Sequence, residues 1–247
     1  MTKNILVIGG AGFVGSELVP KLLDQKYNVK VLDLFIFGDN LPSEKKYPNL
    51  KKIRGDIREL KIIDDALSEI DTVIHLACVA NDPSFELDEK LSEQINYHSF
   101  PPIVKLAKEK GVKRFIFASS AAVYGIKKEE IVTENLSLKP ITGYAKCKAL
   151  CEERLLKEKE KNFEVIILRP ATVCGYSPRL RLDVIVNIFT NQAYNNKLIN
   201  VFGGKQVRPN IHISDMIDAY IECLKFKKDT INGQIFNVGS ENYPILD

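Results

Sequence analysis

Short apolar runs alternate with longer amphipathic stretches over residues 1–170 of the chain. Runs rich in β-branched residues predict strands, because such residues pack well on a pleated surface. Hydrophobic residues three and four apart predict the helices between them. This alternation predicts an α/β fold with a mostly parallel, doubly wound sheet, in which the carboxyl ends of the strands share one edge. The predicted strands lie at 4–9, 29–34, 49–57, 72–77, 114–120 and 163–170, and the predicted helices end near Gln25 and Lys110 or span about 60–69 and 142–161.

After Pro170 the regular alternation of apolar runs and amphipathic stretches ends. Loop-forming stretches such as "SPRLRLD", "FGGKQVRPN" and "NGQ" separate shorter elements. We therefore expect one domain over residues 1–170 and a smaller substrate-binding lobe over 171–247, with some segments packing back on the first domain. The last residues, "FNVGSENYPILD", form a strand-like run followed by the opening of another element, so we expect this lobe to be a partial one.

The composition fits a globular protein whose partner is a small molecule. The chain has 247 residues, of which 45% are hydrophobic and 27% are charged, as in one domain or one domain with a smaller lobe. Lys and Arg number 35 against 32 for Asp and Glu, and the basic residues are spread along the chain. This balance argues against nucleic acid or a membrane surface as a partner.

Cysteine and histidine positions argue against a metal site. The five cysteines form no CxxC pair, and the three histidines are far apart in the sequence. Reduced thiols, a first strand that begins within five residues of Met1 and the lack of an apolar run of ~20 residues predict a cytoplasmic protein. His75 ends a buried strand, where we expect a hydrogen-bonded structural imidazole.

The stretch "NILVIGGAGFVGSELVPKLLD" places a glycine-rich turn between a strand and a helix. Gly9, Gly12 and Gly15 recur every three residues; such a turn lets the backbone approach a ligand closely, and the amides of the following helix favour a phosphate group. Glycines also serve tight turns and close packing, so the pattern alone is weak. Asp33 follows about twenty residues later at the end of the second strand, where a carboxylate bonds an adenosine ribose and repels the 2′-phosphate of NADP. The sequence thus predicts a Rossmann-like domain that binds NAD.

The next strand ends in "GDIR", which has two interpretations. Asp56 and Ile57 follow the strand at a place where they can flank the adenine of such a cofactor. A solvated loop with one capping aspartate explains the same residues.

Three further residues suggest proton transfer. Tyr144 and Lys148, in "TGYAKCK", are four apart and therefore neighbours on one helical face. A tyrosine with a pKa of about 10 is a poor base at neutral pH, but an adjacent ammonium and the positive charge of a nicotinamide favour the phenolate. Ser120, at the end of "RFIFASS", adds a hydroxyl that can hydrogen-bond the same substrate oxygen. Structural explanations stay open, since Tyr and Lys often share an exposed helix face and a strand-end Ser often caps a turn.

Taken in this order, the motifs resemble the extended short-chain dehydrogenase/reductases, and within them the NAD-dependent nucleotide-sugar epimerases and dehydratases. The resembling pieces, "GGAGFVG", "GDIR", "HLAC", "SSAAVYG", "YAKCK", "LRPATVCG" and "RPNIHISD", span nearly the whole chain. The resemblance implies Ser120, Tyr144 and Lys148 as catalytic residues. It also implies a nucleotide-diphosphate sugar as substrate, bound by Arg208, with Asn187 as a second candidate. The cofactor contacts that it implies are Gly9, Gly12, Phe13, Val14, Gly15, Asp33, Asp56, Ile57, Leu76, Ala77, Tyr144 and Lys148.

The resemblance further implies a homodimer, because many relatives pair through two helices of each subunit. The helices near 88–110 and 142–161 are the candidates for this interface.

Departures from the family pattern argue against some of the reactions that the family catalyses. Sugar 4,6-dehydratases carry an Asp–Glu pair where this chain has Ala121 and Ala122, and two methyl groups cannot transfer protons. Ala122 also stands where fucose-type epimerase-reductases carry a cysteine, which argues against 3,5-epimerisation. Thr172 stands where galactose-type 4-epimerases often carry an asparagine, so their contact to the substrate phosphate does not transfer intact.

We therefore expect an NAD-dependent nucleotide-sugar epimerase that acts at C4 through a transient 4-keto sugar. A nucleotide-sugar 4-ketoreductase or dehydrogenase of the same family is the alternative, because the residues above do not separate the three. A non-catalytic NAD-binding regulatory or scaffold protein is an alternative of another class, against which the intact Ser, Tyr and Lys argue.

Overall fold

A parallel sheet forms the centre of the molecule. The computed structural model describes residues 3–129, 131–240 and 242–246, and its large sheet has the strand order β3-β2-β1-β4-β5-β6-β9. Neighbouring strands pair in parallel, which confirms the predicted doubly wound, Rossmann-like α/β fold. The strands are β1 Asn4–Ile8, β2 Asn28–Asp33, β3 Leu50–Arg54, β4 Thr72–His75, β5 Arg114–Ala118, β6 Glu164–Pro170 and β9 Gln234–Val238.

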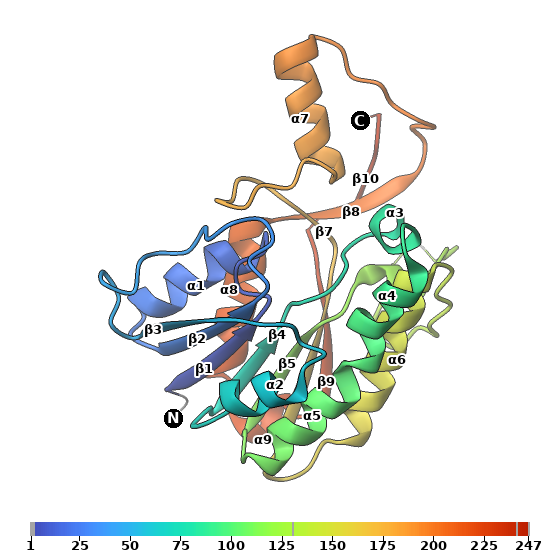
Figure 1. The fold of residues 1–247 in the computed structure, drawn as a ribbon. Coiled ribbons are helices and arrows are strands. Elements are labelled where there is room, and N and C mark those ends of the chain that lie inside the picture. Colours follow the sequence, from blue (N-terminus) through green and yellow to red (C-terminus); the bar gives the residue numbers. More distant parts are fainter. Residues whose placement is uncertain (1–2, 130, 241, 247) are drawn as a thin grey trace.

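Helices cover both faces of this sheet, as Figure 1 shows. Two of them pack on one face and three on the other. The first pair is α1 Gly15–Asp24 and α8 Ile213–Lys225, and the second group is α2 Leu60–Ala66, α5 Phe100–Glu109 and α6 Gly143–Lys157.

The sequence of β1 explains this two-sided packing, because successive side chains of a strand point to opposite faces. Ile5 and Val7 join the core under α1 and α8, whereas Leu6 and Ile8 join the core under α2, α5 and α6. A strand that is buried on both faces reads as a continuous apolar run, which is what the sequence has at this place.

The helix predicted to end near Lys110 is a series of shorter pieces, so the prediction of one long helix was wrong. A wide π-helical turn precedes α5, and the Ser99 amide donates across it to the Gln94 carbonyl at 3.0 Å. Pro101 and Pro102 have no amide hydrogen and cannot continue a regular helical hydrogen-bond ladder from the preceding residues. The pieces before α5 are α3 Asp82–Glu86, α4 Glu89–Glu93 and η1 Gln94–His98.

A second, small sheet lies beyond the carboxyl edge of the large one, together with α7 (Figure 1). Its strand order is β10-β8-β7, with β8 parallel to β7 and antiparallel to β10. The chain then returns to the large sheet through α8 and β9, and the domain boundary at residue 170 stays a prediction. These elements are β7 Thr172–Cys174, α7 Ile185–Asn196, β8 Val207–His212 and β10 Asn242–Pro244, and the remaining short helices are η2 Ala121–Tyr124 and α9 Lys228–Ile231.

No helix in the described part of the chain has the length and apolar character that crossing a lipid bilayer requires.

His75, at the end of β4, is not the hydrogen-bonded imidazole that the sequence suggested. Neither ring nitrogen has a hydrogen-bond partner among the described residues, because the ring packs against Phe100, Phe115 and Phe117. Burial, and then the charge of Lys148, lower the pKa of His75 to about 3. His75 is therefore a neutral part of the core at physiological pH.

Candidate active site

The glycine turn joins β1 to α1 at the place where the strand order reverses, between β1 and β4. Gly9 has a φ of +84°, and a Cβ there would lie 2.6 Å from the amide nitrogen of Ala77. A Cβ on Gly15 would lie 2.5 Å from the Cα of Gly10. A Cβ on Gly12 would meet only the Gly9 carbonyl oxygen, at 3.3 Å. The first and third glycines thus allow close packing, while the middle one leaves the backbone open to a ligand.

Asp33 holds the glycine turn to the end of β2. Its Oδ2 accepts a hydrogen bond from the Ala11 amide at 2.9 Å, and its Oδ1 accepts one from the Phe35 amide at 2.8 Å. A carboxylate oxygen has two lone pairs, so each oxygen can also accept a bond from a ribose hydroxyl.

The start of α1 suits a phosphate group. Val14 occupies the N-cap position and has no side-chain acceptor for the first amides of the helix. These amides and the helix dipole favour an anion. Phe13, the preceding residue, is buried in the core that lies under α1.

The other predicted cofactor contacts follow β3 and β4 at the same edge of the sheet. Ile57, just after β3, is buried, and Asp56 pairs with Arg58 at 2.6 Å. Hydrogen bonds from Arg58 hold the pKa of Asp56 below its ordinary value. Leu76 and Ala77 follow β4, and their amides donate to the last carbonyl of β1 at 2.8 and 3.0 Å.

β5 and α6 bring the three predicted catalytic residues together. Ser120, two residues beyond β5, lies close enough to Tyr144 to lower its pKa, and the Ser120 hydroxyl accepts the Ala122 amide at 3.1 Å. Tyr144 lies in the first turn of α6, whose start is capped by the Thr142 hydroxyl, which accepts a backbone amide at 3.2 Å. Lys148 lies one turn further along α6. Its Nζ donates to the Ala118 carbonyl at 2.6 Å and lies 5.7 Å from the centroid of the Tyr144 ring.

Opposing effects set the acidity of Tyr144. Burial raises the pKa of Tyr144, and the charge of Lys148, the nearby Ser120 hydroxyl and the charge of Arg181 lower it without outweighing burial. The protein by itself therefore keeps the phenol protonated at neutral pH. A phenolate at neutral pH needs a further positive charge beside the ring, which the oxidised nicotinamide of NAD would supply.

Lys148 is an ammonium although it is buried. Burial lowers the pKa of Lys148, but the acidic groups of Cys78 and Tyr144 outweigh that effect, and the net shift is upward. The Cys78 thiol, which follows β4, also lies beside Lys148. Cys78 therefore belongs to the same cluster.

Arg181, in the loop before α7, brings a guanidinium to this cluster. It forms an ion pair with Asp183 at 2.6 Å, and Asp183 in turn accepts a hydrogen bond from the Asn81 side chain. The charge of Arg181 acts on both Tyr144 and Cys78. The segment after residue 170 thus contributes positive charge to the site.

Asn187 and Arg208, the predicted substrate-binding residues, lie on α7 and β8. Asn187 is buried; its Oδ1 accepts from the Gly175 amide at 2.9 Å, and its Nδ2 donates to the carbonyls of Gly175 at 3.1 Å and Arg181 at 2.8 Å. Both hydrogens of this amide group are therefore used within the loop that carries Arg181. Arg208 is exposed, and the contact of either residue with a substrate stays a prediction.

Comparison with known proteins identifies the family. Residues 5–239 match the NAD dependent epimerase/dehydratase family. The chain belongs to this family. A UDP-glucose 4-epimerase from Lactobacillus helveticus is 29% identical, with 96% of this chain and 76% of that protein covered.

Solved structures of family members have the same fold. The UDP-glucuronic acid 4-epimerase of Bacillus cereus, in complex with UDP-glucuronic acid and NAD, is 30% identical with a TM-score of 0.89, covering 99% of this chain and 80% of that one. A UDP-N-acetylglucosamine 4-epimerase from Methanobrevibacter ruminantium, in complex with UDP-N-acetylmuramic acid, is 28% identical with a TM-score of 0.88, covering 99% and 79%.

Family membership makes the chain an NAD-dependent enzyme, and its own residues fit that cofactor. A turn without obstructing side chains at Gly12, a helix start without a side-chain cap at Val14 and the carboxylate of Asp33 meet the needs of a pyrophosphate and a ribose.

The sequence held only weak signals for the site residues that were not predicted. Arg181 and Asp183 stand in "RLRLD", which reads as a charged loop, and Cys78 stands beside the predicted contact Ala77. Glu152, discussed below, lies eight residues after Tyr144 and therefore on the same helical face. That spacing was the one signal that could have been used.

Proposed function

We propose that this protein is a UDP-sugar 4-epimerase that uses NAD. The observation that carries the proposal is the cluster in which Tyr144 lies beside Lys148 and Ser120, at the sheet edge that carries the glycine turn. UDP sugars are the proposed substrate class, since relatives with this fold are 4-epimerases solved with UDP-glucuronic acid or UDP-N-acetylmuramic acid.

Tyr144 is placed to take the proton of the sugar 4-hydroxyl while that carbon is oxidised. Ser120 holds the same oxygen by a hydrogen bond, and the ammonium of Lys148 stabilises the phenolate. NAD, held at the glycine turn and by Asp33, would supply the acceptor and donor of the hydride at C4. The 4-keto sugar presents its other face, and Tyr144 then gives the proton back to the oxygen of the inverted carbon. Protons and electrons balance over one cycle.

The residues after Ser120 favour epimerisation over dehydration. η2 begins with Ala121 and Ala122, whose methyl groups cannot act as acid or base for the loss of water. A 4-ketoreductase or a dehydrogenase would use the same cluster but would change the redox state of the cofactor in each turnover. A scaffold protein would need no proton transfer at Tyr144.

We assign the diphosphate of the substrate to the exposed guanidinium of Arg208, because guanidinium groups bind phosphate oxygens bidentately. Asn187 has one acceptor and no spare hydrogen, so its proposed part is to hold the loop of Arg181 and to accept at most one bond from the nucleotide. The cofactor contacts predicted from Gly9 to Ala77 are part of the same proposal.

The proposal is tested with the purified protein. Its bound NAD is released and quantified, and the protein is incubated with UDP-glucose, UDP-glucuronic acid and UDP-N-acetylglucosamine, with products identified by NMR. Inversion at C4 without net reduction of NAD supports the proposal. Tyr144→Phe should abolish turnover and keep NAD binding, whereas Tyr47→Phe, which removes a phenol that bonds Asp24 at the surface, should leave both turnover and NAD binding unchanged. Net formation or consumption of reduced cofactor would point to the dehydrogenase or the reductase.

A homodimer is a further part of the proposal. Leu87 and Leu91, near and on α4, and Leu150 on α6 are exposed, although leucine is usually buried. α4 packs beside α6 (Figure 1), so these side chains offer an apolar face for a second copy. Light scattering should give twice the monomer mass, and Leu150→Glu should reduce it to the monomer.

We also propose a cytoplasmic location. All five cysteines are free thiols, which fits a reducing compartment. Fractionation of cells should recover the protein with the cytoplasmic enzymes.

A further inference from the structure

A buried ion pair joins α6 to β6 beside the catalytic cluster. Arg169 Nη2 lies 2.6 Å from Glu152 Oε2, and Arg169 Nε donates to Glu152 Oε1 at 3.0 Å. The two side chains are 3% and 2% exposed. Two parallel bonds between planar groups fix orientation as well as distance, so this pair ties the helix to the strand rigidly.

The pair continues a row of contacts along one face of α6. Tyr144, Lys148 and Glu152 are spaced four residues apart and therefore point the same way. Lys148 Nζ donates to the Ala118 carbonyl at the end of β5 at 2.6 Å, and the next residue, Ser119, donates its hydroxyl to Glu152. The residue after that, Ser120, lies beside Tyr144.

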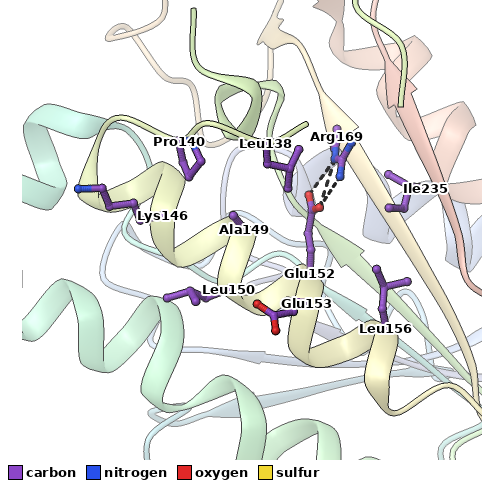
Figure 2. A pocket seen from close by; sticks show the side chains of 10 residues that line it. All are labelled: Leu138, Pro140, Lys146, Ala149, Leu150, Glu152, Glu153, Leu156, Arg169 and Ile235. Carbon is purple, nitrogen blue, oxygen red and sulfur yellow. Dashed lines mark hydrogen bonds and ion pairs between the residues drawn. The ribbon is translucent and has the colours of Figure 1, made fainter. Parts of the chain in front are cut away.

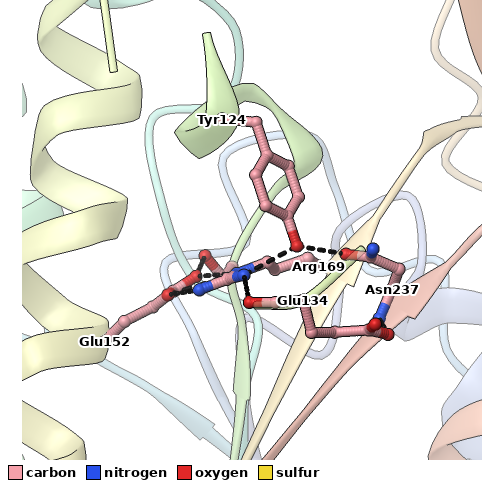
Figure 3. A network of polar contacts seen from close by, with 6 residues as sticks. Tyr124, Glu134, Glu152, Arg169 and Asn237 are labelled. Atoms are coloured by element: carbon pink, nitrogen blue, oxygen red, sulfur yellow. Dashed lines mark hydrogen bonds and ion pairs between the residues drawn. The ribbon is translucent and has the colours of Figure 1, made fainter. Parts of the chain in front are cut away.

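The arginine is itself held by other parts of the fold, as Figure 3 shows. Its Nη1 donates to the Tyr124 hydroxyl at 2.7 Å and to the Glu134 carbonyl at 3.3 Å. The Tyr124 hydroxyl donates in turn to Asn237 Oδ1 on β9, at 2.7 Å. The guanidinium is therefore a fixed point against which α6 is placed.

The pair lies beside a groove, yet solvent scarcely reaches it. Glu152 and Arg169, drawn in Figure 2, line a groove of about 560 Å³ whose other walls are mainly apolar side chains of α6 together with Leu138 and Pro140. Apolar surroundings strengthen an ion pair that has its hydrogen bonds satisfied. The contact therefore stays made while ligands enter and leave the active site.

We propose that Glu152 and Arg169 are positioning residues of the catalytic cluster. They fix α6 against the ends of β5 and β6 and so set the separation of Tyr144 and Lys148 from Ser120. They act through these residues, without touching substrate or cofactor. The proposal rests on the proposed function only for its turnover readouts.

Loss of the pair should slow chemistry more than it weakens binding. A misplacement of reacting groups by about 1 Å can cost about 100-fold in rate. The groups that face Tyr144 are Lys148 on its own helix, Ser120 after β5, Cys78 after β4 and Arg181 before α7. A shifted α6 carries Lys148 along with Tyr144 but moves Tyr144 away from Ser120 and Arg181, which both lower its pKa, so the Tyr144 phenol should then ionise at higher pH.

The test compares two double variants. Glu152→Met/Arg169→Met removes the pair, and Arg114→Met/Glu164→Met removes a matched control, the buried pair at 2.6 Å at the opposite ends of β5 and β6. Replacing both members of a buried ion pair by apolar residues is often tolerated. Each variant is assayed for kcat, KM and NAD affinity. Ionisation of Tyr144 is followed in the NAD-loaded protein by tyrosinate absorbance, with the Tyr144→Phe form as the blank.

We expect the first variant to lose about 10- to 100-fold in kcat, with KM and NAD affinity nearly unchanged and Tyr144 ionising at higher pH. The control variant should have the same kcat, KM, NAD affinity and Tyr144 ionisation as the unmodified protein. A folded Glu152→Met/Arg169→Met protein with normal kcat and normal Tyr144 ionisation would overturn the proposal, and so would an equal loss in the control.

Two provisions keep the test decisive. If the first variant does not fold, Ser119→Ala takes its place, because it removes only the hydrogen bond from the end of β5 to Glu152. Ser119→Ala should likewise lower kcat and raise the pH at which Tyr144 ionises, and unchanged values would overturn the proposal. If the unmodified protein turns over no UDP sugar, the proposed function fails, and the Tyr144 titration alone then supports or overturns the positioning role.

Discussion

At the scale of single residues, the charge on Lys148 sets how easily Tyr144 becomes a base. Burial raises the pKa of Tyr144, and Lys148 is the largest of the effects that lower it. Lys148→Met should therefore raise that pKa further, so that turnover falls at neutral pH and recovers only at higher pH. The measurement is kcat/KM as a function of pH. Lys146→Met, an exposed lysine of the same helix, should leave the profile in place, and an unshifted profile for Lys148→Met would contradict this role.

Asp33 is the residue that should decide between NAD and NADP. Its carboxylate is fixed beside the glycine turn and repels a 2′-phosphate. Asp33→Asn keeps a hydrogen-bonding side chain and removes the charge, so the ratio of NADP to NAD affinity should rise. Calorimetric titration of both cofactors measures this. Asp64→Ser, at a surface ion pair, is the control, and an unmodified protein that binds NADP as tightly as NAD would refute the assignment.

At the scale of elements, the wide turn η1 supports the chain segment after β4. Asn96 accepts from the Val79 amide at 2.7 Å and donates to the Val79 carbonyl at 3.0 Å, and it is buried. Asn96→Ala leaves two buried backbone groups without partners, which should lower the free energy of unfolding by about 1–3 kcal/mol. Urea denaturation gives the value. The control Asn195→Ala removes an exposed hydrogen bond on α7 and should change the free energy of unfolding by less than about 0.5 kcal/mol. Equal losses in the two variants would contradict the role of Asn96.

The strands were predictable because consecutive apolar residues such as Ile5 and Leu6 indicate burial on both faces of a sheet. The break before α5 was missed because proline is accepted in the first turn of a helix, so Pro101 and Pro102 do not disturb the apolar spacing around them. Tyr144 and Lys148 were found because their relation is local to one helix. The ion pair of Glu152 with Arg169 was not, because it joins two elements whose contact depends on the whole fold.

At the scale of the whole molecule, cofactor binding should couple to stability. The glycine turn, Asp33 and the start of α1 come together only in the folded chain. NAD should therefore bind the folded state and stabilise it. At a free concentration of 100 times its dissociation constant, a ligand adds about 2.7 kcal/mol. Thermal unfolding should shift upward with NAD in both the unmodified protein and Tyr144→Phe, and less in Asp33→Asn. The absence of any shift would mean that the fold does not hold the cofactor.

The tertiary course of the chain after residue 170 limited what the sequence could reveal. β9 pairs with β6 in the large sheet although β9 lies near the end of the sequence. A short run such as "FNV" contains no information about which strand it will pair with. Arg181 affects Tyr144 only because a distant loop is brought to the same edge of the sheet. Side chains that reach the site in this way have no local pattern, whereas the glycine turn does.

The most direct test of the proposed 4-epimerase activity uses a UDP sugar that carries deuterium at C4. We expect a product that is inverted at C4, still carries the deuterium at that carbon and forms without net reduction of NAD, with Tyr144→Phe inactive. Loss of the deuterium to solvent, or product in which C4 stays oxidised, would contradict the proposed 4-epimerase.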